Sequence, residues 1–185
     1  DAARSPDEVD AHATADPALT PLVMVADCLP VALSWPRGVA TAHCGWRGLA
    51  GGIAGAAASA VEARAAAIGP GIGPCCYEVG EEVLAEFGGL EGVSTRGMLD
   101  LGAVATRLLE RAGVEVVDRS ELCTSCNPEL FYSHRRDGER TGRHRHVQRR
   151  GRRQLEREGS REQVDNHGLV VAAVLLDQQL QRFPV

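Results

Sequence analysis

The sequence predicts an α+β fold, close to the α/β class, with a mixed β-sheet packed against helices in a single domain. Short apolar segments bounded by turn residues are typical of strands, and the Ala- and Leu-rich segments between them are typical of helices. Strands that alternate with helices favour a sheet with some parallel pairing. At 185 residues and 44% hydrophobic residues, the chain can bury one core and is short for two ordinary domains.

The predicted elements follow one another in a regular order. Pro36-Arg37-Gly38 is a turn signal between two apolar segments, which predicts a β-hairpin. Asp100 and Gly113 suit the N-cap and the C-cap of a helix that lies between them. The predicted strands are 22–28, 31–35, 39–43 and 114–117, and the predicted helices are 49–67, 78–87 and 101–112.

Charge is unevenly spread along the chain. The net charge is −5, yet residues 135–161 hold 11 arginines against four acidic residues, which leaves the remainder at −12. This basic segment contains no Phe, Tyr or Trp for base stacking and no helix-turn-helix or zinc-finger pattern, so we interpret it as a solvated tail and expect no nucleic-acid partner. Since no apolar segment reaches membrane length and no signal peptide is visible, we expect a cytoplasmic protein without a membrane partner.

A cysteine and a histidine stand at the ends of two predicted strands. Cys28 precedes Leu-Pro, and His43 ends the second strand of the predicted hairpin, which can bring the histidine back beside the cysteine. Thiolate and imidazole suit either a zinc site or a Cys–His nucleophile pair. Arg47 and the start of the predicted 49–67 helix favour a bound anion such as phosphate. The motif 135–138 (RRDG) would add a second anion clamp if it folds near His43.

The remaining cysteines and histidines give weaker signals. Cys123-x-x-Cys126 has metal or redox spacing, but without a second such motif or a thioredoxin-like context we favour a pair of structural cysteines. Cys75 and Cys76 are adjacent and cannot easily bridge each other, so we expect reduced, buried or metal-bound cysteines. His144-x-His146 suits adventitious metal binding only.

Five motifs together resemble one family, the polyphenol-oxidase or laccase-like proteins now described as zinc-dependent purine nucleoside phosphorylases with adenosine deaminase activity. The motifs occur in the family's order and cover roughly residues 10–143. They are ADCLP (26–30), AHCGWRG (42–48), IGPGIGPCCYEVG (68–80), LDL (99–101) and LCTSCNPELFYSHRRDGERTGR (122–143).

The resemblance implies zinc as cofactor, with Cys28 and His43 as both metal ligands and catalytic residues. It also implies a third ligand, a histidine in a segment upstream of residue 1, so we interpret residues 1–143 as the family's domain lacking its N-terminal segment. Residues 144–185 are then an Arg-rich tail of unknown role. His12 does not match the missing ligand, and we do not favour His167 as its replacement.

The implied function is phosphorolysis of purine nucleosides, including methylthioadenosine, together with deamination of adenosine. Zinc-bound hydroxide would attack C6 of adenine, and Arg47 would hold inorganic phosphate against the ribose C1′. Two alternatives stay open: a Cys–His hydrolase, which the resemblance extends to peptidoglycan precursors, and an inactive truncated remnant. A multicopper oxidase is rejected, because the chain has six histidines and a single His-x-His pair.

Overall fold

The computed structural model describes residues 9–35, 38–148 and 173–175, and its main feature is a mixed five-stranded sheet. The strand order is β1-β4-β3-β5-β8, in which only the β5–β8 pair is parallel. The predicted mixed sheet packed with helices is thus confirmed. These strands are β1 (Ala11–Thr14), β3 (Leu29–Trp35), β4 (Gly38–Cys44), β5 (Ala65–Ile68) and β8 (Val116–Arg119).

The remaining elements cover this sheet or extend from it. A second sheet has the order β10-β9-β2, and a small hairpin joins β6 to β7. The bounds of these strands are β2 (Leu22–Val25), β6 (Ser94–Thr95), β7 (Met98–Leu99), β9 (His144–Val147) and β10 (Ala173–Leu175). The helices are α1 (Trp46–Ala50), α2 (Ile53–Ala60), α3 (Glu81–Glu86), α4 (Leu101–Arg111), α5 (His134–Asp137) and the 3₁₀ turn η1 (Gly138–Arg140).

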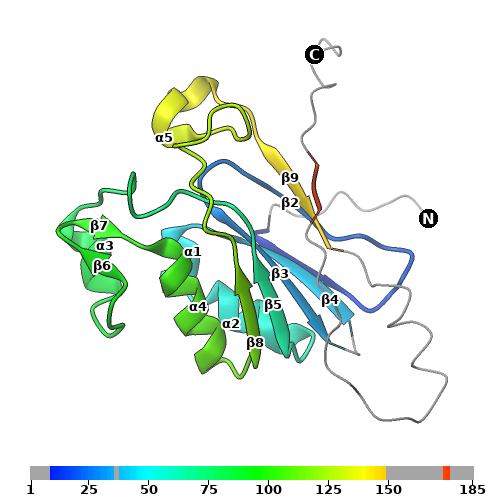
Figure 1. Ribbon diagram of the computed structural model, residues 1–185. Coiled ribbons are helices and arrows are strands. Elements are labelled where there is room, and N and C mark those ends of the chain that lie inside the picture. Colours follow the sequence, from blue (N-terminus) through cyan, green and yellow to red (C-terminus); the bar gives the residue numbers. More distant parts are fainter. Residues whose placement is uncertain (1–8, 36–37, 149–172, 176–185) are drawn as a thin grey trace.

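The predicted hairpin of residues 31–35 and 39–43 is confirmed as the centre of the sheet. β3 and β4 pair antiparallel, from Leu29 opposite Cys44 to Trp35 opposite Gly38. The first six residues of β3 are buried on both faces of the sheet. Such burial requires a layer on each side. Helices α1 and α2 contact β4, and strand β2 contacts β3 and β4 as well (Figure 1).

Alternation along the strands shows which side chains meet each layer. Leu29, Val31 and Leu33 belong to the core that β3 forms with Leu49 of α1 and Ala54 of α2. The intervening residues of β3 therefore point to the opposite face of the sheet, since the side chains of a strand alternate. That opposite face is the one against which the β2–β9 sheet packs.

The prediction of one helix over residues 49–67 is wrong in two respects. The segment breaks at Gly51 and Gly52, where Gly52 has φ +85°, and it resumes as α2. The helix then ends at Ala60, and Ala65–Ile68 forms β5, which pairs with β3 on one side and β8 on the other. Alanine is small enough to be buried in a central strand, so the tertiary pairing overrides the helical preference of this Ala-rich segment.

The other predicted elements are confirmed with small shifts. Asp100 caps α4 as expected, because its Oδ1 accepts a hydrogen bond from the backbone N–H of Ala103 at 2.9 Å. Gly113 follows the helix with φ +88°. The strand predicted over 114–117 lies at 116–119, and the 78–87 helix shortens to α3. No helix in the described part of the chain is long and apolar enough to span a membrane.

The sequence places residues 144–185 in a tail, and the structure describes two pieces of it. Residues 144–147 form β9, which pairs antiparallel with β2, and residues 173–175 form β10 on the other side of β9. The arginines of 149–172 lie outside the described residues, as does His167.

Candidate functional site

Cys28 and His43 lie at the end of the β3–β4 hairpin. His43 pairs with Pro30 across the two strands, and Cys28 lies one residue beyond the last register pair, opposite Gly45. Pro30 and His43, as a register pair, point to the same face of the sheet, whereas Cys28 lies in the bend that leads into β3. A Cβ on Gly45 would lie 2.9 Å from Cys28 Sγ, so only glycine leaves room for the thiol there.

An aspartate orients the imidazole of His43. The Nδ1 atom of His43 lies 2.9 Å from Oδ1 of Asp10, and the backbone N–H of His43 donates to the Asp10 carbonyl at 2.7 Å. A carboxylate at Nδ1 favours the tautomer with the proton on that nitrogen, which leaves Nε2 as an acceptor or metal ligand. The sequence analysis did not identify Asp10, since an acidic residue before a short strand gives no signal of its own.

The surroundings of Cys28 disfavour its thiolate form. Burial is the largest cause that raises its pKa, to about 11, and the carboxylates of Asp27 and Asp10 raise it further while Arg143 lowers it. In the absence of a cation, this thiol is therefore protonated at neutral pH. A metal ion at the same place would supply the positive charge that the thiolate lacks.

Asp27 connects this site to a distant part of the chain. Its side chain is buried, with Oδ1 accepting from the Thr124 hydroxyl and Oδ2 from the backbone N–H of Arg135, both at 2.6 Å. Asp27 itself has φ +82°, a left-handed conformation that is uncommon outside glycine. Together these contacts hold the turn before Cys28 against the 123–135 segment.

Arginines line the side of the site nearest Tyr77. The guanidinium of Arg135 lies 5.3 Å from the Tyr77 ring centre and donates to the Glu78 carbonyl at 3.0 Å. Burial and the charge of Cys28 raise the pKa of Tyr77, whereas the charges of Arg135 and Arg47 oppose that rise. Arg47 also stacks over Trp46 at 4.4 Å.

The two expectations for anion binding have different outcomes. In the RRDG motif, the backbone N–H of Arg135 donates to Asp27, the neighbour of Cys28, whereas Arg136 is engaged with Asp137 and with the carbonyls of Thr124 and Phe131. The helix that begins beside Arg47 is α1, which has only five residues. The dipole of so short a helix contributes little to anion binding, and any anion would be held chiefly by the arginines.

The structure brings four cysteines together in one group, which we call the four-cysteine cluster: Cys75, Cys76, Cys123 and Cys126. Their sulfur atoms all lie within 4.8 Å of one another. The interpretation of 123 and 126 as an isolated structural pair is thus incomplete. Burial raises the pKa of Cys123, but hydrogen bonds from the backbone N–H groups of Gly73 and Cys126 and from neighbouring thiols more than offset it and lower that pKa.

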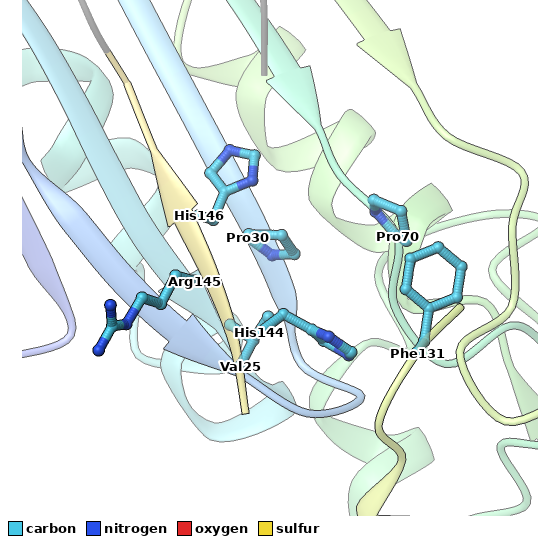
Figure 2. A pocket seen from close by; sticks show the side chains of 7 residues that line it. All are labelled: Val25, Pro30, Pro70, Phe131, His144, Arg145 and His146. Atoms are coloured by element: carbon cyan, nitrogen blue, oxygen red, sulfur yellow. The ribbon is translucent and has the colours of Figure 1, made fainter. Parts of the chain in front are cut away.

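His144 and His146 line a different hollow, between β9 and the Pro30 end of β3. Figure 2 shows both rings beside Pro30, Pro70 and Phe131. Burial lowers the pKa of His146 to about 4 and also lowers the pKa of His144, so both are neutral at pH 7. His144 Nε2 contacts the Tyr132 carbonyl at 3.0 Å. Neither ring belongs to a group of metal-ligating side chains among residues 9–35, 38–148 and 173–175.

Among those described residues, Cys28 and His43 belong to no group of three or more side chains that could share a metal ion. The four-cysteine cluster is the one group there in which three or more His, Cys, Asp or Glu side chains are close enough to share an ion. His12 lies in β1 opposite Thr41 of β4.

The fold and the site define a small α+β domain with a cysteine and an oriented histidine at the same end of its central hairpin. The chain belongs to the family described as multi-copper polyphenol oxidoreductase laccase, whose profile matches residues 1–149. The family to which the motifs pointed is therefore confirmed.

Curated relatives in this family are named purine nucleoside phosphorylases. YlmD of Geobacillus stearothermophilus is 38% identical over 140 residues, covering 64% of this chain and 51% of the relative. YfiH of Escherichia coli is 36% identical over 142 residues, covering 69% and 58%. The chain thus spans about half the length of these relatives.

Solved structures share the fold. The crystal structure of YlmD from Geobacillus stearothermophilus superposes with a TM-score of 0.69 at 37% identity, covering 77% of this chain and 62% of that one. A Neisseria meningitidis protein gives 0.68 at 35% identity, with coverage of 75% and 63%.

Proposed function

We propose that this chain carries the cysteine and histidine of a zinc-dependent catalytic centre that cleaves purine nucleosides with inorganic phosphate. The names of the relatives give the reaction class, and adenosine deamination and methylthioadenosine phosphorolysis are part of the same proposal. The observation that carries it is the His43–Asp10 contact at 2.9 Å, which orients the imidazole at the end of the hairpin where Cys28 leads into β3.

The donor set fits zinc. Cys28 supplies a thiol, His43 can offer Nε2, and Asp10 occupies the position of the carboxylate that commonly supports a zinc-bound histidine. The glycine at position 45 leaves space beside the sulfur. When bound, zinc supplies Lewis acidity and lowers the pKa of a water molecule.

The arginines account for the second substrate. The Arg135 guanidinium lies 5.3 Å from the Tyr77 ring, and the charges of Arg135 and Arg47 both oppose the rise that burial gives the pKa of Tyr77. Guanidinium groups bind phosphate oxygens bidentately and keep their charge at every physiological pH. We assign Arg47 to phosphate binding and Arg135 to the same anion, with its backbone anchored by Asp27.

The Cys–His hydrolase alternative is less well supported by the geometry. A nucleophilic cysteine needs a thiolate, and burial together with Asp27 and Asp10 raises the pKa of Cys28 to about 11. The imidazole of His43 contacts a carboxylate through Nδ1, as a triad histidine would. Among the described residues, however, only the charge of Arg143 lowers the pKa of the Cys28 thiol. The same features are compatible with a metal-bound thiolate.

The test is an assay of inosine, adenosine and methylthioadenosine with and without inorganic phosphate. We expect release of the free base only when phosphate is present, and loss of that release in Cys28→Ala and His43→Ala. Arg47→Ala should raise the KM for phosphate more than it lowers kcat. Cleavage that proceeds equally without phosphate would contradict phosphorolysis, and activity that is lost on alkylation but resists chelators would favour the hydrolase.

A further inference from the structure

The four-cysteine cluster has the dimensions of a mononuclear metal site. Cys126 Sγ lies 3.5 Å from Cys75 Sγ and 3.4 Å from Cys76 Sγ, and no pair of the four sulfurs exceeds 4.8 Å. Thiolates at about 2.3 Å from a tetrahedral zinc ion are about 3.8 Å apart. The distances from Cys126 Sγ to Cys75 Sγ and Cys76 Sγ are slightly below that value, and the upper limit of 4.8 Å is above it. An iron–sulfur cluster would hold its cysteines farther apart, because several metal atoms lie between them.

Two turns present the four sulfurs to one point. Cys75 and Cys76 lie in a turn closed by the hydrogen bond from the Cys76 N–H to the Gly73 carbonyl, which lets adjacent residues reach the same centre. Cys123 and Cys126 lie in a second turn with the C-x-x-C spacing of metal sites. One disulfide would use two of these sulfurs and two disulfides all four, and in the structure all four are free thiols.

Backbone contacts already hold the two turns together. The N–H of Thr124 donates to the Gly71 carbonyl at 2.9 Å, and the N–H of Gly73 donates to Cys123 Sγ at 3.2 Å. A Cβ on Gly73 would lie 3.1 Å from Cys123 Cβ, so the loop approaches the cysteine as closely as glycine allows. Amide hydrogen bonds to sulfur stabilise the thiolate form that a metal requires.

We propose that Cys75, Cys76, Cys123 and Cys126 bind one zinc ion that clamps the 69–80 loop to the 120–133 segment, separately from the Cys28–His43 site. Tetrahedral thiolate sets select zinc among the abundant divalent ions. With four protein ligands the site is closed to substrate, and its role is structural.

The clamp acts on residues at the other site. Tyr77 directly follows the ligand Cys76, and the Arg135 guanidinium lies 5.3 Å from its ring. From the second turn, the Thr124 hydroxyl reaches Asp27, the neighbour of Cys28. Loss of the ion should therefore loosen the pairing of Tyr77 with Arg135. This consequence for the site rests on the proposed function, whereas the metal binding does not.

Metal content of the purified 185-residue chain and its variants tests the clamp. The protein is purified under reducing conditions without chelator, gel-filtered, and analysed for zinc per chain by mass spectrometry. We expect Cys28→Ala/His43→Ala to retain one zinc ion per chain. Cys126→Ser and Cys75→Ser should each lose that ion. Both thiols are exposed, so neither substitution disturbs the core. Ser125→Ala, in the same turn but without a sulfur ligand, is the matched control and should keep it.

Cobalt gives a second readout. Reconstitution of the Cys28→Ala/His43→Ala variant with Co²⁺ should produce the visible bands of a tetrahedral tetrathiolate complex, and these should be absent in Cys126→Ser. The proposal is overturned if Cys28→Ala/His43→Ala holds no zinc, if Cys126→Ser holds as much as the unsubstituted chain, or if intact mass shows a disulfide in place of metal. Failure of the catalytic proposal would appear separately, as unchanged metal content and turnover when Cys28 and His43 are removed.

Discussion

The Cys28–His43 site and the four-cysteine cluster both offer soft ligands, but their surroundings differ in ways that suit different roles. Burial and the carboxylates of Asp27 and Asp10 raise the pKa of Cys28, and Asp10 also orients the imidazole of His43. In the cluster, four sulfurs surround one point, and amide N–H groups favour the thiolate of Cys123. An open site with few ligands suits catalysis, and a closed set of four suits structure.

Hydrogen bonds to Asp27 join the two regions, and one of them runs from the backbone N–H of Ile72 to the Asp27 carbonyl at 2.8 Å. Thr124 lies between two cysteines of the cluster, and its hydroxyl donates to Asp27 at 2.6 Å, next to Cys28. The sites are thus distinct in chemistry but connected through a buried contact. The following predictions separate the two roles, beginning with the largest expected effect.

Cys28→Ala and Cys126→Ser should affect turnover very differently. If Cys28 belongs to the reacting centre, its removal should lower kcat/KM for phosphorolysis by on the order of 10³-fold, equivalent to several kcal/mol of transition-state stabilisation. Loss of the clamp in Cys126→Ser acts only through positioning, and we expect about a tenfold decrease. Steady-state kinetics with inosine measures both. Equal losses in the two variants would remove the distinction between a catalytic and a structural site.

Asp10→Ala should weaken metal binding at the first site alone. The carboxylate orients His43, and loss of such a partner typically lowers metal affinity by about 10–100-fold. Asp10→Asn keeps an acceptor for Nδ1–H and should lose less. Competition with a chromophoric chelator measures the affinity, and zinc in the four-cysteine cluster should be unchanged in both variants. A loss of cluster zinc in Asp10→Ala would show that the two sites are not independent.

Alkylation of the metal-free chain should show that the thiol pKa is raised at Cys28 and lowered at Cys123. Because the pKa of Cys28 is raised to about 11, its thiolate fraction is small at pH 8 and should rise about tenfold per pH unit up to that pKa. In the cluster, backbone and thiol hydrogen bonds outweigh burial and lower the pKa of Cys123, whereas burial raises the pKa of Cys75 and hydrogen bonds with Cys76 and Cys75 raise that of Cys126 to about 12. Cys123 should therefore react before Cys28 at pH 8. Iodoacetamide labelling followed by peptide mass spectrometry gives the order. A Cys28 rate that is independent of pH above 8 would contradict the raised pKa.

Thr124→Val should have the smallest effect. The substitution keeps the shape of the side chain and removes the hydroxyl, which leaves Oδ1 of the buried Asp27 without that donor. Such a loss costs about 1–3 kcal/mol of unfolding free energy. Urea denaturation measures it, and Thr106→Val, at a half-buried helical position whose hydroxyl bonds only to the Gly102 carbonyl, is a control with a smaller expected cost. No difference between the two variants would mean that the Asp27 contact does not hold the regions together.

The sequence could predict what depends on neighbours along the chain. The hairpin follows from the turn signal of the sequence Pro36-Arg37-Gly38, and its register places His43 opposite Pro30, two residues after Cys28. The cap at Asp100 follows from its place before an amphipathic segment. The sequence could not predict the strand at residues 65–67, because this Ala-rich segment is a strand only through its pairing with β3 and β8.

The missed parts of the site depend on long-range contacts. Asp10 is 33 residues from His43, and Cys126 is 50 residues from Cys76. Neither pair has a local signature, since adjacent cysteines and a lone C-x-x-C each have several ordinary explanations. Only the parallel approach of the 71–73 and 123–124 segments makes the four cysteines one group.

Diffraction from crystals of this chain at the zinc absorption edge tests most directly that the two regions are separate metal centres. The account predicts two anomalous peaks, one at about 2.3 Å from the sulfurs of the four-cysteine cluster and one bonded to Cys28 Sγ and His43 Nε2. A single peak shared between the regions, or a cluster whose sulfurs are joined as disulfides with no peak beside them, would contradict it.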